Sequence, residues 1–334
     1  MTTALYGPAG FYSAGPGPAA HFRTSVTASQ LLADCLAPWV ASLDAELGHP
    51  DPFDVVDVGG GDGRLLLQLA GALASEPVSS RLRLTCVEQR GRPSDVPQTV
   101  RWEHSTPQDV VGLVLAHELL DNAPVDVVTV DGSGRLRRVL VDAEGDEQLG
   151  GDPDAETRAW LERWWPMDDA TVGDRAEVGD RRDALWQQLV GSLRQGVALA
   201  VDYVHERDER ARRQWASGTL TAYRDGRLVP IHLDGSCDVT AHVALDACAA
   251  AGRAIGIDDE ARLTQRDALL RLGLDAPRPD HALATSQPLQ YVRMLQHRGQ
   301  AHELMDAAGL GGFGWLLQSR GCRVPAPLGK VRVT

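Results

Sequence analysis

Val55-Val56-Asp57-Val58-Gly59-Gly60-Gly61-Asp62-Gly63 is the stretch that decides the fold of this 334-residue chain. A short apolar run ends in an acid and continues into a glycine loop, as at the first strand-to-helix turn of a doubly wound α/β sheet. Glycine at positions 59 and 61 allows a tight turn and lets the backbone approach a ligand closely. The stretch therefore predicts a nucleotide-type cofactor site formed by Asp57, Gly59, Gly61 and Gly63.

The spacing of the glycines discriminates between cofactors. A dinucleotide loop has the pattern G-x-G-x-x-G, but the sixth position counted from Gly59 is Arg64, and the pattern here is G-x-G-x-G. Asp57 stands two residues before the first glycine, where a carboxylate can accept hydrogen bonds from an ammonium group. These features favour S-adenosylmethionine over a nicotinamide cofactor. Because glycine-rich loops also occur as plain turns, the loop taken alone leaves both interpretations open.

A second acid supports the cofactor interpretation. Residues 81–88 are predicted to form the next strand, which ends in Glu88. This carboxylate stands roughly 25 residues beyond the loop, where the corresponding acid of dinucleotide sites accepts hydrogen bonds from a ribose. The alternative for Glu88 is a solvated charge at the end of a strand.

Predicted strands and helices alternate from residue 54 onward. Strands are predicted at 54–58, 82–88, 111–117 and 195–203, and a helix at 63–74. Such alternation is typical of a doubly wound α/β fold, in which helices cover both faces of a parallel sheet. We therefore predict a Rossmann-like sheet of this class.

Two domains are expected, an N-terminal lid and helix at 1–50 and the main domain at 51–334. The glycine- and proline-rich residues 1 to about 24 predict no regular structure before Thr24 or Ser25, which could cap a helix running through Trp39. The main domain is expected to carry insertions at about 125–190 and 205–300. Within them we predict a hairpin of 125–130 with 136–141, a packed tryptophan-bearing helix near 160–165, and a solvated helix face at 207–213.

Composition excludes several classes of function. The formal net charge of −13 argues against duplex nucleic acid as a partner and favours a cationic substrate or peptide. Five scattered cysteines without a C-x-x-C pair predict neither a disulfide framework nor a metal site, and they suit a reducing cytoplasm. The chain shows no signal-peptide pattern and no apolar run long enough to span a membrane, so no membrane partner is expected.

Candidate catalytic carboxylates follow the predicted strand at 111–117. Glu118 ends this strand, and Asp121 follows three residues later, so both are expected at the carboxyl edge of the sheet where ligands of open α/β folds bind. Two carboxylates can grip a guanidinium, which presents five donors in a planar fork, and can orient one nitrogen toward a methyl donor. The alternative is structural, with Asp121 capping a helix and Glu118 in an ion pair.

Further candidates lie at the ends of later strands. Asp202 ends the strand at 195–203 and is expected at the same edge, with His205 just beyond it. His242 follows a glycine-bearing turn and is a candidate for direct chemistry. Both histidines have a structural alternative as satisfied core or surface residues. No nucleophilic triad motif and no H-x-x-x-H metal pair accompanies them.

The chain resembles the MidA-like S-adenosylmethionine-dependent methyltransferases, which include a mitochondrial complex I assembly factor that methylates a protein arginine. The family's E-L-G-P-G-x-G loop matches 57–63, its V-E matches 87–88 and its A-N-E-[FL]-[FL]-D-x-x-P-V matches 116–125. Other blocks match in the same order at 10–12, 20–30, 201–204, 238–243, 264–273 and 310–313. The resemblance thus covers nearly the whole chain and implies a class I methyltransferase sheet.

The resemblance also implies a function and further site residues. Thr24 and His117, each inside a matched block, join the expected cofactor-binding residues. The implied reaction is methyl transfer to a nitrogen nucleophile, with a protein or peptide arginine as the favoured acceptor. The sequence leaves the oligomeric state open, with a homodimer as one option. A small-molecule methyltransferase and a degenerate cofactor-binding assembly factor are the alternatives.

Departures from the family pattern concentrate in the lid. His21 replaces the Asp of G-D-F, Val26-Thr27 replace P-E, and His117 replaces the Asn of N-E. Since the cofactor blocks are kept while the lid is changed, cofactor identity carries over from the resemblance better than substrate identity does.

Overall fold

The computed structural model describes residues 1–14, 25–142 and 145–329. Its centre is a seven-stranded sheet in the order β15-β16-β9-β4-β1-β2-β3. The bounds of these strands are β1 Phe53–Val58, β2 Leu82–Val87, β3 Arg101–Glu103, β4 Val110–His117, β9 Leu193–Asp202, β15 Asp259–Thr264 and β16 Gly314–Arg320. The predicted α/β fold is confirmed, with strands at each predicted place.

The expectation of a purely parallel sheet is wrong at one strand. β1, β2, β3, β4 and β9 pair in parallel, whereas β16 is antiparallel to both β9 and β15. The reason is the path of the chain. Thr264, the last residue of β15, lies opposite Gly314, the first of β16, so the chain leaves and re-enters the sheet at the same edge and must run back in the opposite direction.

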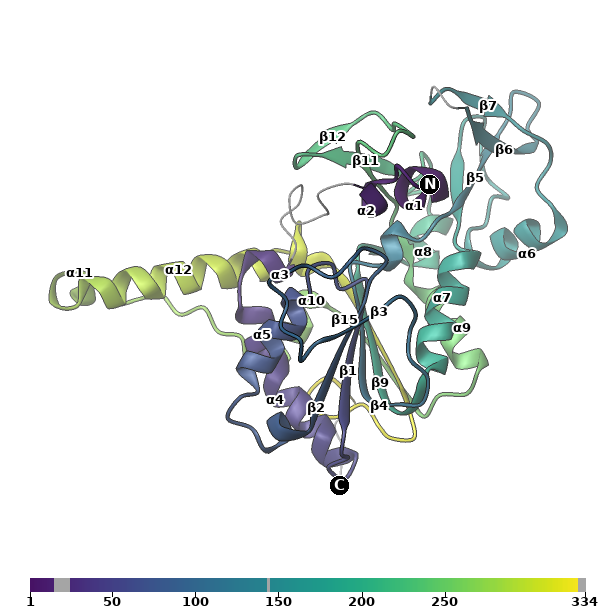
Figure 1. Cartoon of the computed structure of the whole chain (residues 1–334). Helices are drawn as coiled ribbons and strands as arrows, with labels where there is room; N and C mark the ends of the chain where they lie inside the picture. The colour runs from purple at the N-terminus through teal and green to yellow at the C-terminus, as the bar shows by residue number, and fades with distance from the viewer. Residues whose placement is uncertain (15–24, 143–144, 330–334) are drawn as a thin grey trace.

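Helices cover both faces of the sheet (Figure 1). One face packs against α4 (Leu31–Glu46) and α5 (Arg64–Ala72), whose leucines form a core with the strand residues Val55, Leu113 and Leu199. The other face packs against α7 (Asp180–Gly191) and α9 (Leu245–Ala254). Strands buried on both faces are mainly apolar, which is why β4 and the Val55–Val56 part of β1 stood out in the sequence, although β1 also carries the buried Asp54 and Asp57.

The N-terminus differs from the prediction. Two short helices, α1 (Thr2–Tyr6) and α2 (Phe11–Ala14), form where glycine and proline argued against regular structure. Leu5 and Phe11 are buried against Ala222 and Val239, so tertiary burial outweighs the unfavourable local propensity. The predicted cap is also wrong, because α3 (Ser25–Ala28) is a separate turn and α4 begins after Gln30 without a side-chain cap.

A second layer of strands lies above the carboxyl edge of the central sheet (Figure 1). β5 (Asp126–Val130) and β6 (Leu136–Val141) pair antiparallel, which confirms the predicted hairpin. β7 (Glu147–Leu149) and β8 (Arg175–Val178) complete a four-stranded sheet. α6 (Ala155–Trp164) packs its tryptophan Trp160, together with Trp165, against this layer, as predicted.

The rest of this layer follows β9 along the chain. It comprises β10 Val204–His205, α8 Arg207–Ala211, β11 Thr221–Arg224, β12 Arg227–Val229, β13 Asp238–Thr240 and β14 Val243–Ala244. The remaining elements are η2 Pro77–Arg81, η3 Leu120–Asn122, α10 Gln265–Arg271, α11 Ala282–Ser286, α12 Pro288–Met305 and η4 Leu310–Gly312. None of the helices in the described part of the chain has the length and hydropathy to cross a bilayer.

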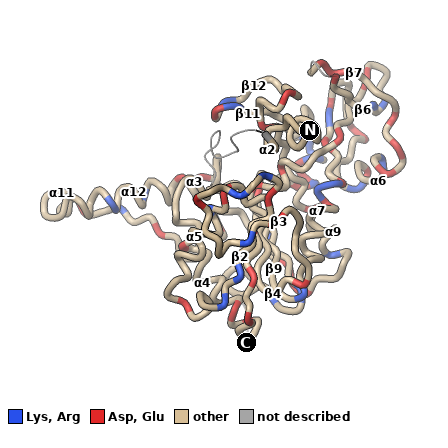
Figure 2. The backbone as a smooth tube through the Cα atoms, in the orientation of Figure 1, with Lys and Arg blue, Asp and Glu red and all other residues tan. Residues whose placement is uncertain are grey.

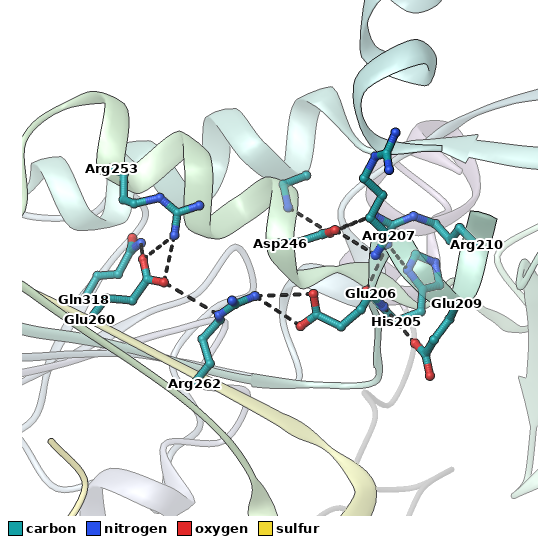
Figure 3. A network of polar contacts seen from close by, with 11 residues as sticks. His205, Glu206, Arg207, Glu209, Arg210, Asp246, Arg253, Glu260, Arg262 and Gln318 are labelled. Carbon is teal, nitrogen blue, oxygen red and sulfur yellow. Dashed lines mark hydrogen bonds and ion pairs between the residues drawn. The ribbon is translucent and has the colours of Figure 1, made fainter. Parts of the chain in front are cut away.

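The predicted solvated face at 207–213 is wrong at Arg210, which is buried (Figure 3). Its guanidinium donates to the Asp246 carboxylate at 2.8 Å and to the carbonyl of Trp164, and it contacts His205 Nδ1 at 2.7 Å. Because these groups pair with its donors, the guanidinium is compensated for the free energy lost when it is removed from water. From Glu206 the network continues through Arg262 and Glu260 to Gln318 of β16, which ties the second layer to the edge of the central sheet.

Candidate functional site

A cavity of about 780 Å³ opens at the carboxyl edge of the sheet, beyond the ends of β1, β2 and β4. Seven of the predicted site residues line it, namely Asp57, Gly59, Gly61, Glu88, His117, Glu118 and Asp121. Gly63, Asp202 and His242 are not among the lining residues. Thr24 lies outside the described residues.

The glycine loop forms one wall of this cavity. Gly61 has φ +60°, and a Cβ built on it meets no atom within 4 Å, so the space beside it is open. Gly60, which the sequence argument passed over, has no such space, because a Cβ there would lie 2.7 Å from Cys86 Sγ and 2.8 Å from Asp57 Oδ2. Gly63 precedes α5 as its left-handed N-cap. Gly60 thus allows the loop to pack on Asp57, and Gly61 leaves room for a ligand.

Carboxylates end the two strands beside the loop. Glu88 Oε2 accepts from the Gly61 amide at 3.1 Å, and its Oε1 accepts from the Gln89 amide at 2.7 Å. Burial, together with the charges of Glu88 and Asp62, raises the pKa of Asp57 to about 7. Asp57 therefore needs a hydrogen-bond donor or a positive charge to ionise fully. A ligand with an ammonium group and ribose hydroxyls supplies both kinds of donor, so these residues fit S-adenosylmethionine.

Glu118 lines the cavity in an unusual backbone conformation. Its φ of +51° falls in the left-handed region, which a glutamate rarely adopts and which is associated with functional sites. Its amide donates to the carbonyl of Val201 at 2.8 Å, and its Oε1 accepts from the Ser25 amide at 3.2 Å. The chain therefore fixes the position of this carboxylate from β9 on one side and from the lid on the other.

No described side chain neutralises Glu118. Its nearest basic group is His117 Nδ1 at 3.6 Å, but burial lowers the pKa of His117 to about 4, so that imidazole is neutral. Burial and the nearby Asp121 raise the pKa of Glu118 to about 8. A partly desolvated carboxylate without a counter-charge gains most from a cationic ligand.

Asp121 is the second carboxylate of this pocket. Its Oδ2 accepts from the Thr240 hydroxyl at 2.6 Å, while its buried Oδ1 has no hydrogen-bond partner among the described residues. The buried guanidinium of Arg182 donates to the carbonyls of Asp121, Ala123 and His242. Arg182 thus holds the turn that carries Asp121 against the strand that carries Thr240.

Asp202 and His242 lie behind the cavity wall. Asp202 is fully buried, and its Oδ2 accepts from the amides of Leu120 and Asp121 at 2.9 and 3.1 Å, so it supports the turn that carries Asp121. The His242 ring stacks on Tyr203, which does line the cavity, with ring centroids 5.7 Å apart. Both residues therefore contact the wall and not the space inside it.

A third acidic group, Asp238, lines the cavity, although no local sequence pattern singled it out as a site residue. Asp238 accepts from the Tyr12 hydroxyl at 3.0 Å and from Asn122 Nδ2 at 3.0 Å. Burial and the charge of Asp121 raise the pKa of Asp238 to about 7. Tyr6 and Tyr12 stack on each other and bring the N-terminal helices over the opening. The matched blocks at 10–12 and 238–243 contained Tyr12 and Asp238, but only the fold shows that these two residues meet.

A family model of S-adenosyl-L-methionine-dependent methyltransferases matches residues 35–260. The chain belongs to this MidA-like family.

Solved structures and a curated relative agree with the assignment. A Burkholderia thailandensis protein crystallised with S-adenosylhomocysteine has a TM-score of 0.80 and 27% identity, over 98% of this chain and 89% of that one. A native crystal structure from the same organism has a TM-score of 0.79 and 27% identity, over 98% and 88%. The mitochondrial protein arginine methyltransferase NDUFAF7 homologue of Drosophila melanogaster is 26% identical over 264 residues, which is 66% of this chain. The match spans only 57% of the fly protein. The cofactor of the family is S-adenosylmethionine.

Substitution of Gly61 tests the glycine wall. Gly61→Val is expected to abolish binding of S-adenosylhomocysteine, because a branched side chain at φ +60° is strained and would fill the open space beside the loop. Isothermal titration calorimetry measures the affinity, and circular dichroism checks the fold. Gly71→Ala, at an exposed helical position of α5, is the matched control and should bind normally. A folded Gly61→Val protein with unchanged affinity would remove the loop from the site.

Proposed function

We propose that this protein transfers a methyl group from S-adenosylmethionine to a guanidinium nitrogen of an arginine in a protein or peptide. The observation that carries the proposal is the Glu118 carboxylate, which lines the cavity with 18% of its side chain exposed, is fixed at a strained φ and has no cationic partner among the described residues. The fly relative, named as a protein arginine methyltransferase, supports the same acceptor.

The charge pattern of the cavity favours a cationic acceptor. Glu118, Asp121 and Asp238 all line it, and, after burial itself, the charge of Asp121 raises the pKa of both Glu118 and Asp238. A guanidinium stays protonated at physiological pH and offers several donors in one plane, so it can satisfy more than one carboxylate at once. The unpartnered Oδ1 of Asp121 is available as one such acceptor.

Orientation and proton transfer are the roles of these residues. S-adenosylmethionine, when bound, supplies an electrophilic methyl group. Glu118 and Asp121 would align the acceptor nitrogen, which loses one proton as its bond to the methyl carbon forms and the carbon–sulfur bond of the sulfonium breaks, leaving the neutral thioether. With a pKa raised toward neutrality, Glu118 is suited to accept this proton. Asp202 and Arg182 act indirectly, by holding the turn that carries Asp121.

A small-molecule acceptor is the second candidate. The observation in its favour is that Val26 and Thr27, which replace the family's P-E, line the cavity together with Tyr6 and Tyr12. An enclosed pocket lined by aromatic rings would suit a free cationic metabolite. Preference for an arginine within a peptide over free arginine decides between the two candidates.

A cytoplasmic location is part of the proposal. All five cysteines are free in the structure, and four of them are buried. Thiols that stay reduced are typical of cytosolic proteins.

Neutralising Glu118 tests the acceptor role. Glu118→Gln keeps the shape and can still accept from Ser25, but it removes the charge, so turnover is expected to fall by ~10²-fold or more. Affinity for S-adenosylhomocysteine should stay within about twofold of wild type. Methyl transfer from labelled S-adenosylmethionine to lysate protein and calorimetry measure the two quantities. A variant that loses S-adenosylhomocysteine binding but keeps turnover at saturating cofactor would assign Glu118 to the cofactor.

The pH dependence of acceptor binding gives an independent test. A cation stabilises the ionised carboxylate, so affinity for N-acetylargininamide should rise between pH 6 and pH 9 as Glu118, with its pKa of about 8, ionises. At pH 7 binding should release protons to the buffer, which calorimetry in two buffers of different ionisation enthalpy detects. Glu118→Gln should flatten the rise. The neutral isostere N-acetylcitrullinamide is the matched control, and equal binding of both probes would contradict the proposal.

A further inference from the structure

A closed cycle of side-chain contacts joins three distant segments beside the cavity, namely α2, η3 and β13. Tyr12 Oη lies 2.9 Å from Asn122 Oδ1 and 3.0 Å from Asp238 Oδ2. Asn122 Nδ2 closes the cycle at 3.0 Å from Asp238 Oδ1. The same Nδ2 lies 3.4 Å from the carbonyl of Val239, so the amide has its nitrogen toward two acceptors and its oxygen toward Tyr12.

The number of protons in this cycle bears on the charge of Asp238. A carboxylate and an amide oxygen only accept hydrogen bonds, and the Tyr12 hydroxyl has a single proton to donate. If Asp238 is ionised and accepts that proton, the contact between Tyr12 and Asn122 Oδ1 joins two oxygens at 2.9 Å with no proton between them. If Asp238 is protonated, it donates to Tyr12, Tyr12 donates to Asn122, and Asn122 donates to Asp238. All three contacts are then hydrogen bonds, so the geometry fits a neutral Asp238.

The surroundings of Asp238 also favour its neutral form. The titratable groups that face it include no cation and are Tyr6, Tyr12, Glu118, Asp121, Tyr223 and Cys237. Residues 1–14, which contain α1 and α2, include no Asp, Glu, Lys or Arg, and Figure 2 shows this segment in tan. Burial and the charge of Asp121 raise the pKa of Asp238 to about 7. The N-terminal helices therefore contact Asp238 through neutral groups.

The cycle connects the helices over the opening with the residues of the acceptor region. Asn122 directly follows Asp121, and Thr240, two residues beyond Asp238, donates to the Asp121 carboxylate. We propose that Asp238 is a positioning residue, which in its protonated form holds α1 and α2 over the cavity by completing the hydrogen-bonded cycle with Tyr12 and Asn122. This role goes beyond the proposed methyl transfer and does not depend on which acceptor is methylated.

Hydrogen exchange of the backbone amides in α1 and α2, measured by mass spectrometry on the full chain, tests the proposal. A carboxyl whose pKa is raised by closure favours the closed form below its ordinary pKa of ~3.9, and this effect is lost as pH rises to about 7. Protection of these amides, corrected for the intrinsic exchange rate, is therefore expected to fall by roughly tenfold to 100-fold from pH 5 to pH 7. Burial lowers the pKa of the Met1 ammonium, which gives a pH effect of the opposite sign.

Two substitutions separate the proton from the cycle. Asp238→Asn replaces the protonated carboxyl with an amide that makes the same contacts without a titrating proton, so protection should stay high from pH 5 to pH 7. Tyr12→Phe removes the hydroxyl, so protection should already be low at pH 5. Tyr6→Phe is the matched control, because it removes the other tyrosine hydroxyl of these helices, which donates to the Asn122 carbonyl, and leaves the cycle intact. It should keep the fall with pH.

Three results would overturn the proposal. The first is wild-type protection of α1 and α2 that does not change between pH 5 and pH 7. The second is an Asp238→Asn protein that keeps the wild-type fall, since a different group would then titrate. The third is a Tyr12→Phe protein with wild-type protection at pH 5. Exchange of the β9 amides and binding of S-adenosylhomocysteine are measured on each variant, so a global loss of structure and a failed methyltransferase assignment both remain distinct from a failure of this proposal.

Discussion

A partly buried carboxylate without a counter-ion among the described residues is the constraint on which this site depends. Glu118 is held at φ +51° between β9 and the lid, where burial raises its pKa to about 8. Its folded pKa therefore lies above its unfolded value, and for an acid this means that stability falls as pH rises from about 4.5 to about 8. The loss of folding stability thus arises at a position where a bound cationic ligand would stabilise the ionised carboxylate and offset the loss. The same logic applies to Asp238 and Asp57, so the cavity is poised for cations at both its acceptor and its cofactor regions.

The surrounding structure serves to hold this arrangement. Asp202 fixes the amides of Leu120 and Asp121, while Arg182 binds the carbonyls on the other side of the same turn. The second layer, anchored through the buried Arg210–Asp246 pair, brings Thr240 and Asp238 over the opening. Removal of one member of such a buried pair leaves an uncompensated charge, so these contacts support the geometry more than they add net stability.

The sequence predicted those features that rest on local pattern. The apolar strands, the glycine loop, Glu88, Glu118 and Asp121 all stand at places that periodicity and strand ends identify, and each lies where the pattern indicated. Local sequence pattern could not predict the contacts between segments that are distant in the chain. The meeting of Tyr12 with Asp238, the burial of Arg210 and the helices of the first fourteen residues depend on tertiary packing, which no local spacing records. The reversed β16 likewise follows from the path of the chain.

The most direct test of the account is the position of the transferred methyl group. The purified protein would be incubated with S-adenosylmethionine labelled in its methyl group and with cell lysate, and labelled protein would be hydrolysed and its amino acids separated. The account predicts label in N-methylated arginine, lost in Glu118→Gln. Label confined to small molecules, or to carboxyl esters, would contradict the assignment of Glu118 and Asp121 as the residues that bind a protein guanidinium.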